Sequence, residues 1–139
     1  MTLRDMIWRH EGGPLQGYKD SRGIWTIGIG HNIQDGPPIK QAVLLEIFDD
    51  DLRYFQEQMI ENFPWVKSLD MPRVAVLMDM LFAMGINRLR GFKKMLAAMA
   101  DHNWPDAAKE LRDSDFWRSE THNRAEELAR QLESGEWTQ

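Results

Sequence analysis

The chain has 139 residues, no cysteine and a formal net charge of -5, from 17 basic and 22 acidic side chains. This length suits one domain, and the lack of cysteine excludes disulfides, a thiolate nucleophile and a cysteine metal site. The acidic balance argues against nucleic acid as a partner, because nucleic-acid binding needs a clustered basic surface. No run of about 18 apolar residues is present, and therefore we expect no membrane insertion.

The first predicted element is a short amphipathic helix over 2–11, which Gly12, Gly13 and Pro14 end. Glu11 therefore lies at the carboxyl end of this helix. The negative end of the helix dipole would raise the pKa of the Glu11 carboxyl, and burial would act in the same direction. A general acid that works at neutral pH needs such a raised pKa.

A β-hairpin is predicted next, with strands over 15–19 and 24–29 and a turn at Asp20-Ser-Arg-Gly23. A small third strand is predicted near 32–34. The alternation of strand side chains places Thr26 on one face and Trp25, which we expect to pack, on the other. Gly28 and Gly30, at the end of the second strand and just after it, allow a ligand to approach the backbone closely.

The remainder is predicted to be helical. A long amphipathic helix over 39–61 is expected to bury an apolar stripe of Val43, Leu44, Ile47, Phe48, Leu52, Phe55 and Met59. Further helices are predicted over 72–84, 92–100 and 104–111, with a short segment at 116–117 and a last helix over 122–133 that Thr121 caps. We expect a mainly helical α+β fold, with one domain over 1–139 comprising a hairpin lobe (12–38), a connecting helix (39–61) and a helical lobe (1–11 and 52–139).

Glu11, Asp20 and Thr26 occur at a characteristic spacing, and we call these three residues the ladder. Eight residues separate Glu11 from Asp20, and five separate Asp20 from Thr26. A glycoside hydrolase needs one protonated carboxyl group for the leaving oxygen, one ionised carboxylate, and a group that holds the attacking water. The ladder supplies all three. Each residue also has an ordinary interpretation, since Glu11 could form a helix-end salt bridge, Asp20 could simply form a turn, and Thr26 could be a common strand residue.

The ladder is followed at once by Ile27-Gly-Ile-Gly-His31, and later by Met80-Leu-Phe-Ala-Met-Gly85 and Thr121-His-Asn-Arg-Ala125. With these motifs the chain resembles, over nearly its whole length, the phage-type lysozymes of glycoside hydrolase family 24. The resemblance implies a lysozyme-like fold and inverting hydrolysis of the β-1,4 bond between N-acetylmuramic acid and N-acetylglucosamine in bacterial peptidoglycan. It implies no cofactor and no metal.

The resemblance also implies residue roles. Glu11 would be the general acid, Asp20 the carboxylate facing the oxocarbenium-like charge, and Thr26 the group positioning water. Inversion predicts that the two carboxyl groups lie about 6.5–9.5 Å apart. Arg124 would orient the Glu11 carboxylate, although a solvated helix residue is its ordinary interpretation. Substrate contacts are expected at Asn32, Phe82 and Gly30, whereas Met95 and Glu110 stand at two positions where the sugar preference of the family does not carry over.

His31 and the run Asp49-Asp50-Asp51 together suggest a metal site, but consecutive helical residues point about 100° apart and cannot share one ion. We expect a structural pair between His31 and Asp51 instead.

Two other functions stay open from the sequence: a lytic transglycosylase acting on the same bond, and a non-catalytic wall-binding module. We expect a monomer made in the cytoplasm of a host bacterium during phage or prophage lysis. The amino-terminal residues lack an apolar run of signal-peptide length, so a separate membrane-permeabilising protein would release it to the wall.

Overall fold

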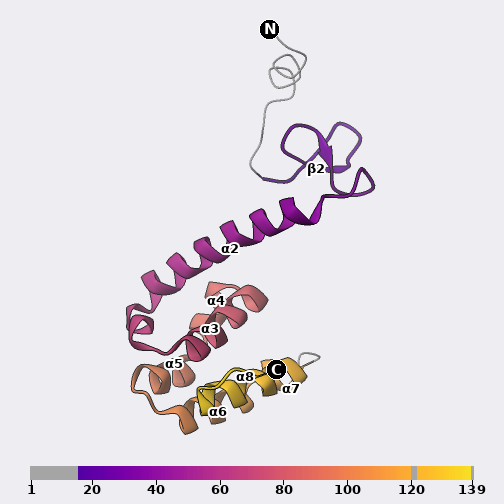
Figure 1. Ribbon diagram of the computed structural model, residues 1–139. Coiled ribbons are helices and arrows are strands. Elements are labelled where there is room, and N and C mark those ends of the chain that lie inside the picture. Colours follow the sequence, from indigo (N-terminus) through magenta and orange to yellow (C-terminus); the bar gives the residue numbers. More distant parts are fainter. Residues whose placement is uncertain (1–15, 120–121, 139) are drawn as a thin grey trace. The chain divides into compact units, whose positions relative to one another are not determined.

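The computed structural model describes residues 16–119 and 122–138 (Figure 1). The predicted helix over 2–11, Glu11 within it, and Thr121 lie outside these residues. In the described part, the protein is mainly helical with a small three-stranded antiparallel sheet, which confirms the predicted α+β class. The chain forms two compact units, Met1–Ile47 and Phe48–Gln139. Their boundary falls within the segment 39–61 that was predicted to connect two lobes.

The sheet consists of β1 (Tyr18–Lys19), β2 (Trp25–Ile27) and β3 (His31–Asn32), paired in that order. The observed strands are shorter than the predicted ones. Gly28 and Gly30 adopt φ values of 62° and 71°, a left-handed conformation that ends β2 and turns the chain into β3. In the register, Thr26 of β2 lies opposite Tyr18 of β1 and Asn32 of β3.

The two faces of β2 differ in exposure, and the expected packing of Trp25 is wrong. Thr26 is only 3% exposed, whereas Trp25 is 48% exposed, with the Lys19 ammonium group 5.2 Å from the centre of its ring. Strand alternation correctly assigns the two side chains to opposite faces. Alternation does not reveal that only one of the two faces of such a small sheet is covered by other residues.

The predicted helix over 39–61 is observed as α2 (Gln41–Asn62). Met59 is buried and Phe55 packs against the core, as expected. The expectation is wrong for the first half of the stripe, where Val43, Leu44, Ile47 and Phe48 are 44–49% exposed. Helical spacing identifies the apolar face of a helix, but it does not establish how far along the helix other elements cover that face.

Seven further helical elements follow α2 in the described residues. The four helices predicted over 72–84, 92–100, 104–111 and 122–133 are all present, and the short segment at 116–117 forms part of α7. The elements are η1 (Pro64–Ser68), α3 (Met71–Met84), α4 (Ile86–Arg90), α5 (Lys93–Ala100), α6 (Trp104–Arg112), α7 (Asp115–Arg118) and α8 (His122–Ser134).

Local signals define the ends of these helices. The Asp70 side chain caps α3 by accepting a hydrogen bond from the Arg73 backbone N–H, and Asn103 caps α6 in the same way. Gly85 and Gly135 end α3 and α8 with φ values of 81° and 72°. None of the described helices is both long enough and apolar enough to cross a membrane.

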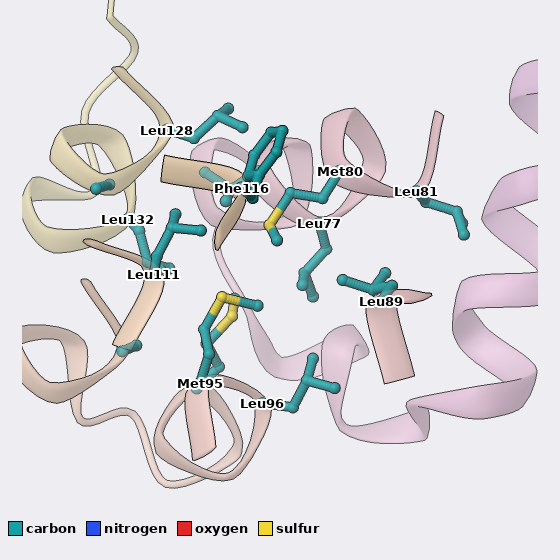
Figure 2. Close-up of a cluster of buried hydrophobic side chains, with 14 of the residues drawn as sticks. Leu77, Met80, Leu81, Leu89, Met95, Leu96, Leu111, Phe116, Leu128 and Leu132 are labelled. Atoms are coloured by element: carbon teal, nitrogen blue, oxygen red, sulfur yellow. The ribbon is translucent and has the colours of Figure 1, made fainter. Parts of the chain in front are cut away.

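The core of the helical unit lies where α3, α5, α6 and α8 meet. Figure 2 shows its side chains gathered in one cluster, with Met95 of α5 beside Leu111 of α6. Residues far apart in the sequence contribute to this cluster, and α6 packs along both α5 and α8. This packing fixes the relative positions of α5, α6 and α7, whose surface residues line a cavity. The labelled core residues are Leu77, Met80, Leu81, Leu89, Met95, Leu96, Leu111, Phe116, Leu128 and Leu132.

Candidate functional site

Asp20 lies at the hairpin turn between β1 and β2, and its carboxylate closes that turn. Asp20 Oδ1 accepts hydrogen bonds from the backbone N–H groups of Ile24 (2.9 Å) and Arg22 (2.8 Å). The hydrogen bond from Ile24 and that from Arg22 hold the pKa of Asp20 below its usual value, although desolvation acts in the opposite direction. Asp20 is therefore an ionised carboxylate at neutral pH, and 26% of its side chain is exposed.

Thr26 lies on β2, six residues after Asp20, and its hydroxyl is anchored to the same turn. Thr26 Oγ1 donates a hydrogen bond to the Ile24 carbonyl at 2.9 Å. The backbone N–H of Asp20 donates to the same carbonyl, also at 2.9 Å. Because the hydroxyl proton is used in this way, the lone pairs of Oγ1 remain as acceptors for a hydrogen of water. The structure thus brings together two of the three predicted catalytic residues, while Glu11 lies outside the described residues.

Arg124 contacts a partner that the sequence analysis did not identify. Its Nε donates to Asp79 Oδ1 at 2.7 Å, and this ion pair joins α8 to α3. Both side chains are partly exposed, at 44% and 38%. The two residues are 45 positions apart, so no local pattern marks them as a pair.

Two of the expected substrate residues lie in the hairpin unit. The Asn32 side chain is engaged locally: Oδ1 accepts from the backbone N–H groups of Gln34 and Asp35, and Nδ2 donates to Asp35 Oδ1. Asn32 also lines a small cavity of about 290 Å³. Gly30 is exposed, and its positive φ of 71° is a conformation that other residues adopt with strain.

The third expected substrate residue, Phe82, lies on α3 in the helical unit. Its ring is half-buried against two aromatic rings of α2, with centroid distances of 4.7 Å to Phe55 and 5.9 Å to Phe48. This aromatic packing gives Phe82 a fixed orientation while leaving part of its ring accessible.

His31 has an unsatisfied polar atom. Its Nε2 is buried and has no hydrogen-bond partner among the residues that the structure describes. A buried polar group of this kind costs free energy until it finds a partner. Asp51, its predicted partner, is an exposed residue of α2, and the pair stays a prediction. Within the described ranges no group of three His, Asp or Glu side chains could hold a metal ion.

A cavity of the helical unit lies between the α4–α5 turn and the α6–α7 turn. It measures about 540 Å³, a volume typical of small-molecule sites. Met95 and Glu110, which the sequence analysis named as two positions where the sugar preference of the family does not carry over, both line it. Sequence analysis missed the other charged residues here. The signal for the basic ones is the stretch 80–100, which holds four cations and no anion in an acidic chain.

Comparison with known proteins shows to which family the chain belongs. The sequence model of the phage lysozyme family matches residues 8–133. The chain belongs to this family. Among its relatives are "Probable T4-type lysozyme 1" and "Probable T4-type lysozyme 2" of Dictyostelium discoideum, each 29% identical over 96% of this chain and 95% of the relative. The "Pre-baseplate central spike protein Gp5" of Enterobacteria phage T4 is also 29% identical, over 90% of this chain but only 26% of that protein.

Family membership confirms the resemblance derived from the ladder and the glycine-rich strand. It supports an enzyme of the lysozyme class that acts on the bacterial cell wall. The matched range includes Glu11, Asp20, Thr26 and Arg124.

Proposed function

We propose that the protein is a muramidase that hydrolyses the β-1,4 bond between N-acetylmuramic acid and N-acetylglucosamine in peptidoglycan, with inversion at the anomeric carbon. The observation that carries this proposal is the linkage of Asp20 and Thr26 in a member of the phage lysozyme family. The backbone of Ile24 binds both the ionised carboxylate of Asp20 and the hydroxyl of Thr26. One turn therefore holds a negative charge and an oxygen that can accept a hydrogen bond from water. Inverting hydrolysis needs a carboxylate and a positioned water on the same side of the sugar ring.

In the proposed mechanism, Glu11 donates its proton to the leaving glycosidic oxygen. Asp20 stays ionised, because its pKa is lowered by the hydrogen bonds from Ile24 and Arg22, and it stabilises positive charge at the anomeric carbon. Thr26 accepts a hydrogen bond from the attacking water and orients its lone pair, and the Asp20 carboxylate takes up the proton that this water releases as it adds to the anomeric carbon. Arg124 acts on the Glu11 carboxylate through its charge. Asn32, Gly30 and Phe82 are proposed to contact the glycan.

The decisive experiment is a turbidity assay on isolated peptidoglycan, with wild type compared with Glu11→Gln. Glutamine keeps the shape of the side chain but cannot donate the proton that the leaving oxygen needs. Wild type should clear the suspension, and Glu11→Gln should not, while retaining the wild-type circular dichroism spectrum and melting temperature. A wild type that binds the wall without clearing it would instead indicate a non-catalytic wall-binding module.

Analysis of the products separates hydrolysis from its closest chemical alternative. A lytic transglycosylase attacks with a hydroxyl of the sugar itself and leaves an anhydro-muramic end, whereas a muramidase leaves a reducing end one water heavier. Mass spectrometry distinguishes the two ends. Proton NMR of the first-formed product distinguishes inversion from retention, since inversion of a β bond yields the α anomer. We further propose that the biological role is wall degradation in phage or prophage lysis.

A further inference from the structure

One face of the hairpin sheet carries a row of three side chains, one from each strand or its continuation. In the register, Lys19 of β1 lies opposite Trp25 of β2. A hydrogen bond of 3.0 Å from the Ile33 N–H to the Trp25 carbonyl extends the pairing of β2 with β3 by one residue. Directly opposite residues of antiparallel strands share a face of the sheet. Lys19, Trp25 and Ile33 therefore lie side by side, and we call them the outer row.

The outer row is exposed and lies on the opposite face of the sheet from the hydroxyl that is proposed to hold water. Trp25 and Ile33 are 48% and 47% exposed, and Lys19 is exposed as well. Thr26 points to the other face and is 3% exposed. Asn32, an expected substrate contact, lies opposite Thr26 in the register and shares its face. A ligand on the outer row would therefore not displace the glycan that Thr26 and Asn32 are proposed to contact.

The Trp25 ring is positioned by its neighbours on the sheet. The Lys19 ammonium group lies 5.2 Å from the centre of the ring. Gly17 precedes Lys19 by two residues, and a Cβ atom at Gly17 would come within 4.0 Å of Trp25 Cε3. The ring thus lies beside β1 at a residue that has no side chain. The Trp25 backbone N–H donates to Gln34 Oε1 at 3.4 Å. Because the ring is held in this way, a ligand binds it with little loss of side-chain entropy.

An accessible indole ring beside an ammonium group is complementary to a sugar ring. The faces of a pyranose carry C–H groups, which the negative face of an aromatic ring attracts. Its rim carries hydroxyl and acetamido oxygens, which can accept hydrogen bonds from the three donors of the Lys19 ammonium group. A lipid bilayer is the poorer match, because the ionised Asp20 directly follows Lys19 and an anionic bilayer repels it.

We propose that Lys19, Trp25 and Ile33 form a second glycan-binding surface, which binds an N-acetylhexosamine ring on the sheet face opposite Thr26. The proposal rests on the proposed function, because that function makes a polymer of such sugars the substrate. Occupying both faces of the hairpin requires two glycan strands, or two distant parts of one strand. The second surface therefore favours the insoluble polymer over a short soluble oligosaccharide.

The test compares activity on isolated peptidoglycan with activity on a soluble peptidoglycan hexasaccharide, which is too short to reach both faces. Trp25→Leu should lower the ratio of kcat/KM on the polymer to kcat/KM on the hexasaccharide by roughly threefold to tenfold, the size expected for one aromatic contact. Trp25→Tyr keeps an aromatic ring and should restore the wild-type ratio. Trp137→Leu, at a tryptophan of the helical unit that is 60% exposed, is the matched control. A ratio that Trp25→Leu leaves unchanged would overturn the proposal.

Binding measured without turnover separates this proposal from the proposed function. Protein carrying Glu11→Gln should sediment with isolated peptidoglycan, and adding Trp25→Leu should raise its Kd by the same roughly threefold to tenfold. A Kd that Trp25→Leu does not change would refute the second surface, whereas a wild type that clears no wall would refute the hydrolytic function. Anionic phospholipid vesicles provide the last comparison. Vesicle binding that depends on Trp25, together with wall binding that does not, would assign the outer row to a membrane and contradict the proposal.

Discussion

Asp20 and Thr26 are joined through the two peptide groups of a single residue, Ile24. The Ile24 N–H donates to the Asp20 carboxylate, and the Ile24 carbonyl accepts the Thr26 hydroxyl, both at 2.9 Å. The Asp20 backbone N–H binds this carbonyl as well. The turn therefore sets the orientation of the carboxylate and the hydroxyl together, and a change at either residue is expected to alter catalysis more than folding.

Replacing Asp20 by Asn should abolish most activity but preserve the hairpin. The amide oxygen of Asn can accept the same N–H groups from Arg22 and Ile24, so the change removes the charge and the 3.5 Å contact of Oδ2 with the Arg22 guanidinium but keeps the turn. We expect wall-clearing activity to fall by about 10²–10³-fold, the range for removal of one electrostatic group from a transition state. Initial clearing rates and the melting temperature measure the two effects. Asp49→Asn, an exposed change of the same kind on α2, should leave the rate unaltered; a fully active Asp20→Asn would refute the role of this carboxylate.

The role of the Thr26 hydroxyl can be tested with two conservative variants, one that keeps the oxygen and one that removes it. Thr26→Ser keeps the oxygen that accepts a water hydrogen, and Thr26→Val replaces it with a methyl group in a site that is 3% exposed. We expect Thr26→Ser to stay close to wild type and Thr26→Val to lose activity by about 10²-fold through misplacement of the water. Kinetic assays on isolated wall provide the measurement. Comparable rates for the two variants would mean that the residue only packs.

A charged network in the helical unit makes a pH-dependent contribution to stability. Arg112 donates two hydrogen bonds of 3.1 Å to Glu126, and Trp117 Nε1 donates a third at 2.8 Å. The bond from Arg112 and that from Trp117 lower the pKa of Glu126 from its ordinary value of 4.5. A carboxyl with a lowered folded pKa stabilises the fold fully above its unfolded value, and this stabilisation disappears as pH falls through the folded pKa.

We therefore expect Glu126→Gln to reduce the free energy of unfolding by about 1–2 kcal/mol at pH 7, allowing for partial exposure of the pair. The difference from wild type should shrink as the pH is lowered below 4.5. Urea unfolding at several pH values measures it, with the exposed Glu136→Gln as control. A difference that does not change with pH would argue that the charge of Glu126 has no part in the network.

Sequence reasoning succeeded where the deciding interaction is local. The Asp20 turn, the long helix and the glycines that end α3 and α8 each depend on residues within a few positions of one another. It missed α4, since five residues between Gly85 and Gly91 are too few to display a helical period. It also overestimated burial along α2, because exposure depends on elements distant in the sequence.

The same limit applies to the candidate site. The ladder of catalytic residues follows from spacing and residue type, and family membership supports it. The Arg124–Asp79 pair and the cavity between the α4–α5 and α6–α7 turns arise from helices packed side by side, which one sequence does not display. Lys93, Lys94 and Glu110 were visible in the sequence, but only the fold shows that they line one cavity.

The predicted pair of His31 and Asp51 can be tested by the coupling energy of a double-mutant cycle rather than by the effect of either single variant on stability. The buried and unsatisfied His31 Nε2 atom motivates the pair. A double-mutant cycle of His31→Asn and Asp51→Asn should give a coupling energy of at least about 0.5 kcal/mol in unfolding experiments. The same cycle with Asp49→Asn, two positions earlier on α2, should give none. Additive effects in the first cycle would rule the pair out.

The structural role of Arg124 in its ion pair with Asp79 can be separated from a role in catalysis, because either partner of the ion pair can be replaced. Arg124→Gln and Asp79→Asn both delete the 2.7 Å contact between α8 and α3. Each should reduce stability by no more than about 1 kcal/mol, because the partners are 44% and 38% exposed. If the guanidinium also orients Glu11, Arg124→Gln should lose activity and Asp79→Asn should not. Clearing rates measured alongside urea unfolding decide the matter, and matching activities of the two variants would reduce Arg124 to a helix-linking residue.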